Sequence, residues 1–407
     1  MILLIKSRSL NFSFDSPLFV YTIAITSFQI TRLIGAFFYP RTKRAFNESI
    51  AAQVQYYEPT VTFVVPFLNE QDAITNTISK CFAVDYPKDK VQVIAINDGS
   101  TDNSVKIVKG LLKKYPNLVL TGWEKNRGKR FAMEEGFHLA SGEIVIQLDS
   151  DSYIQPETFR NLIKPFTDSQ IGAVCAHADP ANADKNWLTK MQAAYYFMSF
   201  RILKAAESTF MTVFCCSGCS SAFRKSAVMP IIDQWMNEKF LGQPMTWGDD
   251  RALTNWIIKQ GYQTIYTDDV HAYTICPDTF KKFLKQQIRW KKSWFANSFF
   301  ASKFILKRDA FVGLTYFFPM IALTLITPFI VIRALLYNPI FKGIIPWHYI
   351  TGIFLISLLM TTYYRYISPN NKYWPYMFVW SGINMIFLSY LLYYALATIQ
   401  DRRWGTR

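Results

Sequence analysis

The sequence predicts an α/β domain with a doubly wound sheet, fused to an α-helical membrane region. Between residues 59 and 150, short runs of aliphatic and β-branched residues alternate with helical patterns, as in consecutive β-α-β units. Long apolar segments lie on either side of the α/β region, at 18–39 and within 310–399. A segment of about 20 apolar residues is long enough to cross a bilayer. The 407 residues are sufficient for both parts.

Four buried strands are predicted in the first half of the α/β region. The strands cover 61–66, 91–96, 118–121 and 143–148, with helices expected at 72–82 and 102–114. Asp98 and Asp149 follow the second and fourth strands. Ligands of a doubly wound sheet bind outside the carboxyl ends of its strands. We therefore expect both carboxylates at the ligand-binding edge.

Composition favours a protein that acts at a membrane. The net charge is +15, from 44 Lys+Arg against 29 Asp+Glu, and 17% of the residues are aromatic. Much of the basic charge flanks the apolar segments, where it suits anionic headgroups and anionic substrates. A nucleic-acid partner is therefore not expected. The six cysteines show no even framework of spacings and are interpreted as reduced thiols. Cys216 and Cys219 form a C-x-x-C without a second ligand pair, so a zinc site is not predicted.

The flanking charges also predict the membrane topology. The segment 18–39 is expected to be an anchor that ends at Pro40, with the basic residues 41–44 in the cytosol. Residues 277–308 mix lysines with aromatic residues and predict amphipathic helices in the membrane interface. The segment 373–399 has basic residues on both sides, so it is interpreted as interfacial or re-entrant. The predicted division is an anchor at 1–40, a cytosolic catalytic domain at 41–276, interface helices at 277–309 and a channel region at 310–407.

Two acidic motifs are the candidate reaction centre. Asp149 and Asp151 stand one residue apart after an apolar strand. Mg²⁺ or Mn²⁺ is typically held by one or two carboxylates together with substrate phosphates. Asp249 and Asp250 precede a helical pattern, and neighbouring carboxylates raise one another's pKa, which suits a general base. A solvated loop is the alternative for the first pair, and ordinary helix capping for the second.

Basic and aromatic residues provide further candidates. Lys129 and Arg130 suit a phosphate-facing loop, although a surface charge run has the same pattern. Gln286, Arg289 and Trp290 share one face of a predicted helix. The indole suits stacking on a sugar ring, and the guanidinium suits a diphosphate. An interface-anchoring Trp beside a snorkelling Arg is the alternative.

Together these motifs resemble the processive family 2 glycosyltransferases, and among them they are most similar to the hyaluronan synthases. The rhizobial chitin-oligosaccharide synthases share the terminal W-G-T-R but usually show G-E-D-R where this chain has G-D-D-R. The segment Cys215–Cys219 departs from the C-S-G-P pattern of bacterial hyaluronan synthases. The motifs that carry the resemblance are Phe67-Leu68-Asn69-Glu70, Asn97-Asp98-Gly99-Ser100, Asp149-Ser150-Asp151, Phe240-Leu241-Gly242-Gln243, Gly248-Asp249-Asp250-Arg251, Gln286-Gln287-Ile288-Arg289-Trp290 and Trp404-Gly405-Thr406-Arg407.

The resemblance implies a GT-A-like mixed sheet and a multi-pass protein of the plasma membrane. It implies an inverting, processive β-glycosyltransferase that polymerises UDP-GlcNAc and UDP-GlcA into hyaluronan and translocates the chain. The partners would be UDP-sugars, the growing polysaccharide and membrane lipids, with no obligate protein partner. A chitin-type synthase that uses UDP-GlcNAc alone is one alternative, and a non-catalytic membrane scaffold is another.

The resemblance also assigns roles to single residues. Asp250 would be the catalytic base, with Asp249 beside it, and Asp149 and Asp151 would hold Mg²⁺ or Mn²⁺. The predicted nucleotide-sugar site comprises Asn69, Glu70, Asp98, Lys129, Arg130, Asp149, Gln286, Arg289, Trp290, Trp404 and Arg407.

Overall fold

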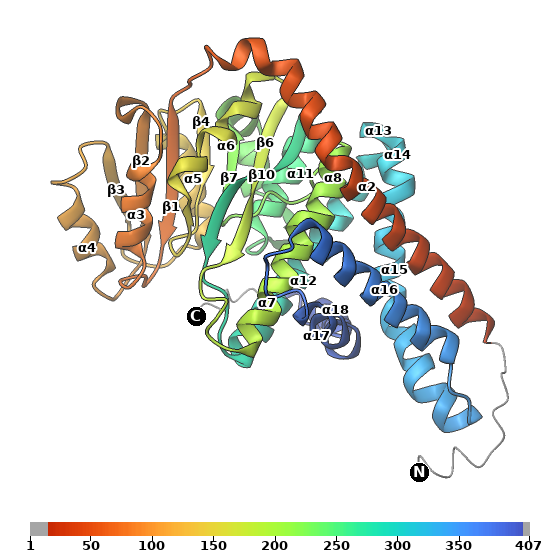
Figure 1. Ribbon diagram of the computed structural model, residues 1–407. Coiled ribbons are helices and arrows are strands. Elements are labelled where there is room, and N and C mark those ends of the chain that lie inside the picture. Colours follow the sequence, from red (N-terminus) through yellow and green to blue (C-terminus); the bar gives the residue numbers. More distant parts are fainter. Residues whose placement is uncertain (1–14, 402–407) are drawn as a thin grey trace.

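The computed structural model describes residues 15–401. An α/β domain carries a group of long helices that project from one side of it (Figure 1). The central sheet has eight strands in the order β3-β2-β1-β4-β7-β6-β10-β5. These strands are β1 (Val61–Phe67), β2 (Val91–Asp98), β3 (Leu118–Trp123), β4 (Ile144–Gln147), β5 (Tyr153–Ile154), β6 (Ile171–Pro180), β7 (Ser221–Arg224) and β10 (Gln263–Thr274). A small separate ribbon pairs β8 (Lys239–Phe240) with β9 (Gln243–Pro244).

The sheet is mixed, as predicted. Strands β3, β2, β1 and β4 are parallel to one another, whereas β7 runs antiparallel to both β4 and β6. Every residue of β1 is buried, because helices cover both faces of the sheet. The four predicted strands are confirmed. The second strand runs on to Asp98, since its ladder with β3 continues as far as Trp123.

The helices of the α/β domain are short and cover the sheet. They are α3 (Ile74–Ala83), α4 (Ser104–Leu111), α5 (Lys129–Leu139), α6 (Arg160–Ile163), α7 (Trp187–Met198), α8 (Ala205–Thr209), α9 (Lys225–Val228), α10 (Ile232–Met236) and α11 (Asp249–Lys259). The π-helical segment Ser199–Lys204 joins α7 to α8 without a break. Short 3₁₀ turns occur at Lys88–Lys90, Pro156–Thr158, Lys164–Thr167 and Met229–Ile231.

The first long helix, α2, runs from Ser16 to Val54. The prediction that it ends at Pro40 is wrong, because Pro40 lies inside the helix. A proline in a helix costs about 3 kcal/mol, and contacts on both sides of Pro40 offset this cost. Gly35 packs so closely that an added Cβ would lie 3.0 Å from the Cβ of Ala206. Beyond the proline, Lys43 pairs with Asp268 at 2.5 Å.

The membrane-type helices follow the α/β domain. They are α12 (Phe280–Ser302), α13 (Ile305–Arg308), a continuous helix over Ala310–Lys342, α16 (Trp347–Ile367), α17 (Tyr376–Ile383) and α18 (Leu391–Ala397). The continuous helix comprises α14 (Ala310–Val312), the π-helical Gly313–Phe317, α15 (Phe318–Ile332) and the π-helical Arg333–Lys342, and a further π-helical turn, Asn384–Leu388, follows α17. Three of the described helices, namely α2, Ala310–Lys342 and α16, are long and apolar enough to cross a membrane.

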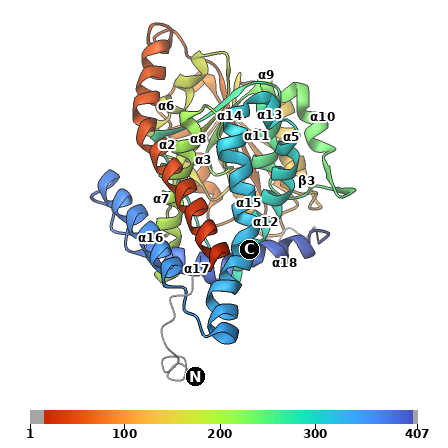
Figure 2. The ribbon, with the colours of Figure 1, turned by 90° about the vertical axis from the view of Figure 1, so that its right-hand side faces the viewer.

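These three helices lie side by side (Figures 1 and 2). Far from the sheet, Asp15 caps α2 and accepts hydrogen bonds from Arg333 at 3.1 Å and Asn338 at 2.8 Å. Asp15 is buried, and a buried carboxylate is stable only when it is paired. The ion pair therefore joins the start of α2 to the end of the Ala310–Lys342 helix.

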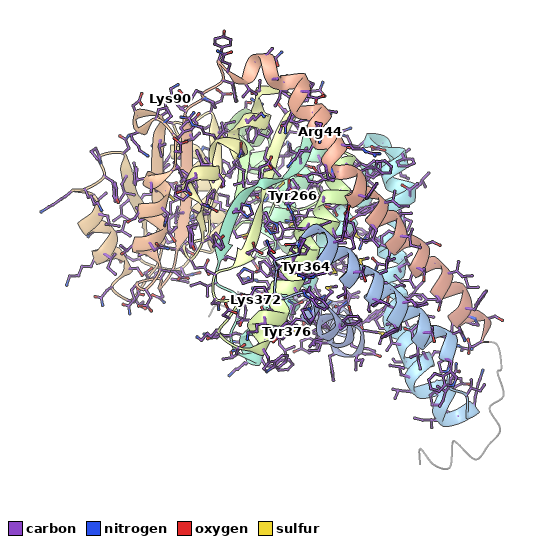
Figure 3. The ribbon with its side chains drawn as sticks, viewed as in Figure 1. Arg44, Lys90, Tyr266, Tyr364, Lys372 and Tyr376 are labelled. Atoms are coloured by element: carbon purple, nitrogen blue, oxygen red, sulfur yellow. The ribbon has the colours of Figure 1, made fainter. Side chains whose placement is uncertain are left out.

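The last apolar segment is bent. The helix Tyr376–Leu388 and α18 meet at 41°, and they run crosswise to α15 (Figure 2). Before the pair, Lys372 bonds to Asp184 at 2.7 Å, and Lys372 and Tyr376 lie beside α7 (Figure 3). After the pair, the Lys292 ammonium donates to the Asp401 carbonyl at 2.8 Å. The segment thus returns to the side of the molecule on which it starts.

One hydrogen-bonded chain connects the apolar helices to the α/β domain. Arg32, within the apolar part of α2, donates to the Tyr316 hydroxyl at 3.4 Å. Tyr316 donates to Glu207 of α8 at 2.6 Å. The second carboxylate oxygen of Glu207 accepts from the Phe214 backbone N–H at 3.2 Å. The loop after α8 is therefore tied to two membrane-type helices through one carboxylate.

Candidate active site

A cavity of about 780 Å³ opens at the carboxyl ends of β1, β2 and β4. Strands of a parallel sheet end at one edge, so the polar residues after each strand meet there. The predicted site residues that line the cavity are Asn69, Glu70, Asp98, Lys129, Asp149, Asp151, Asp249, Asp250, Gln286, Arg289 and Trp290. Trp404 and Arg407 lie outside the described residues.

Asn69 joins the loops that follow β1 and β2. Its side-chain oxygen accepts from the Thr101 N–H at 2.8 Å, and its own N–H donates to the Ser100 hydroxyl at 3.0 Å. Asn69 adopts a left-handed conformation, with φ of 55°, and asparagine tolerates this region better than most residues. The Glu70 N–H donates to Ser104 at 2.8 Å. Both residues thus shape the rim of the cavity.

Asp98 organises the loop before α5. Its carboxylate accepts from the Trp123 indole at 2.6 Å and from the backbone N–H groups of Arg127 at 2.8 Å and Gly128 at 3.0 Å. Gly99 is required beside it, because its φ is +83° and an added Cβ would lie 2.5 Å from the Asn126 nitrogen. Asp98 therefore holds the 126–128 loop against the end of β2.

Lys129 and Asp149 form an ion pair in the cavity wall. Burial disfavours the charged lysine, but Asp149, Asp250 and Asp249 outweigh this effect and raise the pKa of Lys129. Lys129 is therefore an ammonium ion at neutral pH. Its positive charge suits a phosphate group near Asp149.

Asp149 and Asp151 have the chemistry expected for a hard cation. Both carboxylates line the cavity, and Asp151 also accepts from the Ser152 hydroxyl at 3.1 Å. Within residues 15–401, no group of three His, Cys, Asp or Glu side chains could hold a metal ion. The oxygen ligands of Asp149 and Asp151 fit Mg²⁺ or Mn²⁺, provided that substrate phosphates supply further oxygens.

The prediction that Arg130 faces the phosphate together with Lys129 is wrong. Arg130 is buried below the cavity and is absent from its lining. Its Nε donates to Asp249 at 2.8 Å, and its Nη1 lies 3.5 Å from Glu238. Lys129 and Arg130 open helix α5, and neighbouring residues of a helix point about 100° apart. The helix thus aims one cation at the cavity and buries the other.

Asp249 and Asp250 are separated in the same way at the start of α11. Asp249 pairs with Arg130, whereas Asp250 accepts from the Gly218 N–H at 3.1 Å and from the Arg251 N–H at 2.8 Å. These two donors orient the Asp250 carboxylate and keep it in the cavity wall.

Gly218 lies between the two acidic motifs. Its N–H donates to Asp250, and its carbonyl accepts from the Asp149 N–H at 3.1 Å. An added Cβ would lie 2.6 Å from the Gln147 side-chain nitrogen and 3.1 Å from the Lys129 ammonium. Only glycine allows this approach without displacing its neighbours.

Helix α12 closes the opposite side of the cavity. Gln286, Arg289 and Trp290 all line the cavity, which confirms that they share one helix face. The Trp290 ring lies 6.2 Å from the Tyr195 ring, and Tyr195 stacks on Trp380 of α17 at 4.0 Å. An aromatic wall thus extends from the cavity to the bent helix pair.

Many residues of the cavity wall were not predicted as site residues, among them Tyr195, Lys204 and Arg251. Lys204 stands three residues from both Arg201 and Glu207, a spacing typical of an exposed helix face, so the sequence gives no signal that its charge is buried. Tyr195 carries no signal either, because an aromatic residue in an amphipathic helix is usually a packing residue.

The fold and the cavity define a glycosyltransferase of the GT-A-like type. A family model described as Glycosyl transferase family 2 matches residues 62–231. The chain therefore contains a family 2 glycosyltransferase domain, which includes the loops carrying Asn69, Asp98, Asp149 and Gly218.

Full-length relatives extend the similarity beyond this domain. The chain is 28% identical to a hyaluronan synthase of Streptococcus pyogenes over 397 residues, which is 95% of this chain and 90% of the relative. It is 29% identical to an N-acetylglucosaminyltransferase of Rhizobium meliloti over 359 residues, which is 86% of this chain and 82% of that protein.

Among solved structures, a mannosyltransferase from Pyrobaculum calidifontis in complex with GDP-Man and Mn²⁺ has the same fold. The TM-score is 0.59 at 20% identity, with 95% of this chain and 99% of the other covered.

The buried Arg130–Asp249–Glu238 cluster predicts a pH effect on stability. Burial, aided by the Asp249 charge and opposed by Arg130, raises the pKa of Glu238 from 4.5 to about 7. A carboxyl with a raised pKa stabilises the fold below its unfolded pKa and loses that contribution as pH rises through the folded pKa. The loss between pH 4.5 and 7 is up to about 3 kcal/mol.

Glu238→Gln should therefore remove a fall in thermal midpoint that the wild type shows between pH 5 and pH 8. Thermal unfolding of the purified protein in detergent at both values measures this difference. Equal pH dependence in the two proteins would contradict the role of Glu238.

Proposed function

We propose that the protein is a membrane-integrated, inverting and processive β-glycosyltransferase that polymerises UDP-GlcNAc and UDP-GlcA into hyaluronan and translocates the chain. One observation carries the proposal, which is that a single cavity contains the Asp149/Asp151 pair, Asp250 and the α12 face with Trp290. The similarity to a hyaluronan synthase along 95% of the chain supports the choice of polymer.

The second candidate is a chitin-type synthase that uses UDP-GlcNAc alone. It is favoured by the 29% identity to an N-acetylglucosaminyltransferase of Rhizobium meliloti. Both candidates require the same transfer chemistry and differ only in the donors.

In the proposed reaction, the loop held by Asp98 binds the nucleotide, with Asn69 and Glu70 at its rim. Asp149 and Asp151 would hold Mg²⁺ or Mn²⁺, which supplies positive charge to the diphosphate when bound. Lys129 lines the same part of the cavity, and Arg289 of α12 lines the opposite side. Trp290 would stack on the acceptor sugar, with Gln286 beside it.

Asp250 removes the proton from an acceptor hydroxyl. The hydroxyl oxygen forms a bond to the anomeric carbon while the bond from that carbon to the UDP oxygen breaks, so the configuration inverts. The N–H groups of Gly218 and Arg251 keep the base in position. The ammonium of Lys129 stabilises the charge that develops on UDP. Asp249, through its bond to Arg130, acts as a positioning residue.

The proposed topology places the α/β domain in the cytosol and the protein in the plasma membrane. Helices α2, Ala310–Lys342 and α16 would each cross the bilayer. The bent pair α17–α18 would be re-entrant, since Lys372 before it bonds to Asp184 of the α/β domain and Asp401 after it bonds to Lys292 of the interface helix α12. Helix α12 would lie in the interface among the lipids. The proposed division remains 1–40, 41–276, 277–309 and 310–407, with α2 continuing past the first boundary to Val54. Trp404 and Arg407 would belong to a loop that closes over the nucleotide.

Asp250→Asn should lower the rate of sugar transfer by roughly 10²–10⁴-fold, the usual contribution of a general base. UDP affinity should stay within about twofold of wild type, because the base acts on the acceptor. Transfer is measured by UDP release, and affinity by calorimetry. Asp249→Asn is the matched control, because it breaks the buried pair with Arg130 and should lower thermal stability more than Asp250→Asn does. Normal turnover by Asp250→Asn would refute the assignment.

Asp151→Ala should weaken binding of UDP in the presence of Mg²⁺ by roughly tenfold or more, since even outer-shell substitutions cost 10–100-fold in metal affinity. Calorimetry with and without EDTA separates the metal-dependent part of binding. Wild-type affinity for UDP that EDTA leaves unchanged would exclude the metal role.

The proposed polymer requires two donors. High-molecular-weight product should form only when UDP-GlcNAc and UDP-GlcA are both present, and a hyaluronan-specific lyase should digest it. Gel filtration of radiolabelled product measures this requirement. Polymer from UDP-GlcNAc alone, cut by chitinase and resistant to the lyase, would assign the chitin-type reaction instead.

A further inference from the structure

A buried lysine without an acidic partner lies in the cavity wall. Lys204 is only 7% exposed and ends the π-helical segment between α7 and α8. Its ammonium lies 2.5 Å from the Ser217 hydroxyl, 3.3 Å from the Cys175 sulfur and 4.1 Å from the centre of the Phe200 ring. Within residues 15–401, no Asp or Glu oxygen lies within 4.0 Å of it. Its charge is therefore solvated by neutral groups alone.

The other lysines at this site are either paired with an acid or exposed to solvent. Lys129 pairs with Asp149, Lys185 and Lys282 pair with Asp278, and Lys285 is exposed. A buried ammonium has three N–H donors and a strong need for an anion. A hydroxyl and a thiol satisfy two of these donors, and sulfur is a weak acceptor. Lys204 thus keeps one donor and an uncompensated positive charge in the cavity wall.

A second cation, Arg251, lies in the wall of the same cavity as Lys204. In the described part of the chain its guanidinium forms no ion pair with an acid. Lys204, Arg251, Tyr195 and Cys215 all line the one cavity. Burial disfavours the charged guanidinium of Arg251, but the charges of Asp250 and Glu207 act on it and help to raise its pKa. Burial, aided by the Asp250 charge, raises the pKa of Cys215 to about 11. The thiol is thus neutral at pH 7 and offsets neither cation.

The chemistry of the anion follows from the proposed substrates. In the proposed function, the diphosphate is bound by Lys129 and by the metal ion that Asp149 and Asp151 would hold. The remaining anion in a reaction that uses UDP-GlcNAc and UDP-GlcA is the carboxylate of a hexuronate. An ammonium and a guanidinium in the wall of the cavity that holds Asp250 would bind that carboxylate through charge-assisted hydrogen bonds.

We propose that Lys204, together with Arg251, forms the binding site for the carboxylate of a hexuronate, either on the UDP-sugar donor or at the end of the growing chain. The inference rests on the two-donor function proposed above and names the residues that would select for a uronate. Neutral sugars would gain nothing from Lys204.

The test uses the full-length protein in lipid vesicles and the variants Lys204→Met, Lys204→Gln and Lys204→Arg. In one arm, KM and kcat are measured for UDP-GlcA and for UDP-GlcNAc, each with the other donor saturating. In the other arm, transfer of one sugar is measured onto oligosaccharides whose growing end is either glucuronate or N-acetylglucosamine.

If the donor carboxylate binds Lys204, the neutral variants raise KM for UDP-GlcA by roughly tenfold to a hundredfold, while KM for UDP-GlcNAc changes less than about twofold. If the chain-end carboxylate binds there, transfer onto glucuronate-ended acceptors falls by a similar factor and transfer onto N-acetylglucosamine-ended acceptors is kept. Lys204→Arg restores activity in either case. The thermal midpoint of Lys204→Met is unchanged or higher, because an unpaired buried charge has been removed.

Equal losses with both donors and both acceptors would overturn the proposal and assign Lys204 a structural role in holding Ser217. Unchanged kinetics in both neutral variants would overturn it as well. Polymer formed by the wild type from UDP-GlcNAc alone would refute the two-donor function itself. This result is distinct from failure of the Lys204 proposal, because it is seen in the wild-type protein and not only in the Lys204 variants.

Discussion

The backbone of Gly218 makes the two hydrogen bonds on which the arrangement of the site depends. Its N–H orients the Asp250 carboxylate, and its carbonyl holds the backbone at Asp149. Two acidic motifs that are far apart in the sequence are therefore held at a set spacing by one residue. A side chain at this position would collide with Gln147 and approach Lys129. The metal-type carboxylates and the candidate base cannot move independently, which is what a transfer between donor and acceptor requires.

The same loop links the site to the membrane-type helices. Phe214, at its start, donates to Glu207, and Glu207 accepts from Tyr316, which in turn accepts from Arg32 of α2. At Cys216, the loop N–H donates to the Thr254 hydroxyl on α11 at 3.0 Å. The loop is thus held from the membrane side and from the helix that carries Asp250.

Charge placement separates supporting residues from residues that can act on a substrate. Arg130 pairs with Asp249, which lies in the cavity wall, and with Glu238, and all three side chains are buried. Lys129, Asp149 and Asp250 face the cavity. Lys204 is the exception. It is buried like the first group and lines the cavity like the second, but it has no acidic partner among residues 15–401. Such an imbalance is costly in an unliganded protein and is removed when an anion binds.

Local patterns in the sequence were enough to predict a doubly wound α/β domain, the four strands that begin it and the residues that follow those strands, whereas the mixed sheet was predicted only by the family resemblance. Burial of apolar runs and the geometry of strand ends depend on neighbouring residues alone, so Asp98, Asp149 and the Gln286–Trp290 face could be located from sequence. The continuation of α2 through Pro40 could not, because it depends on Ala206 and Asp268, which are distant in the chain. The separation of Lys129 from Arg130 depends on Asp249, and the isolation of Lys204 depends on which side chains surround it. Only tertiary structure decides such pairings, because the free energy of a buried charge is set by the groups that packing brings within a few ångströms of it.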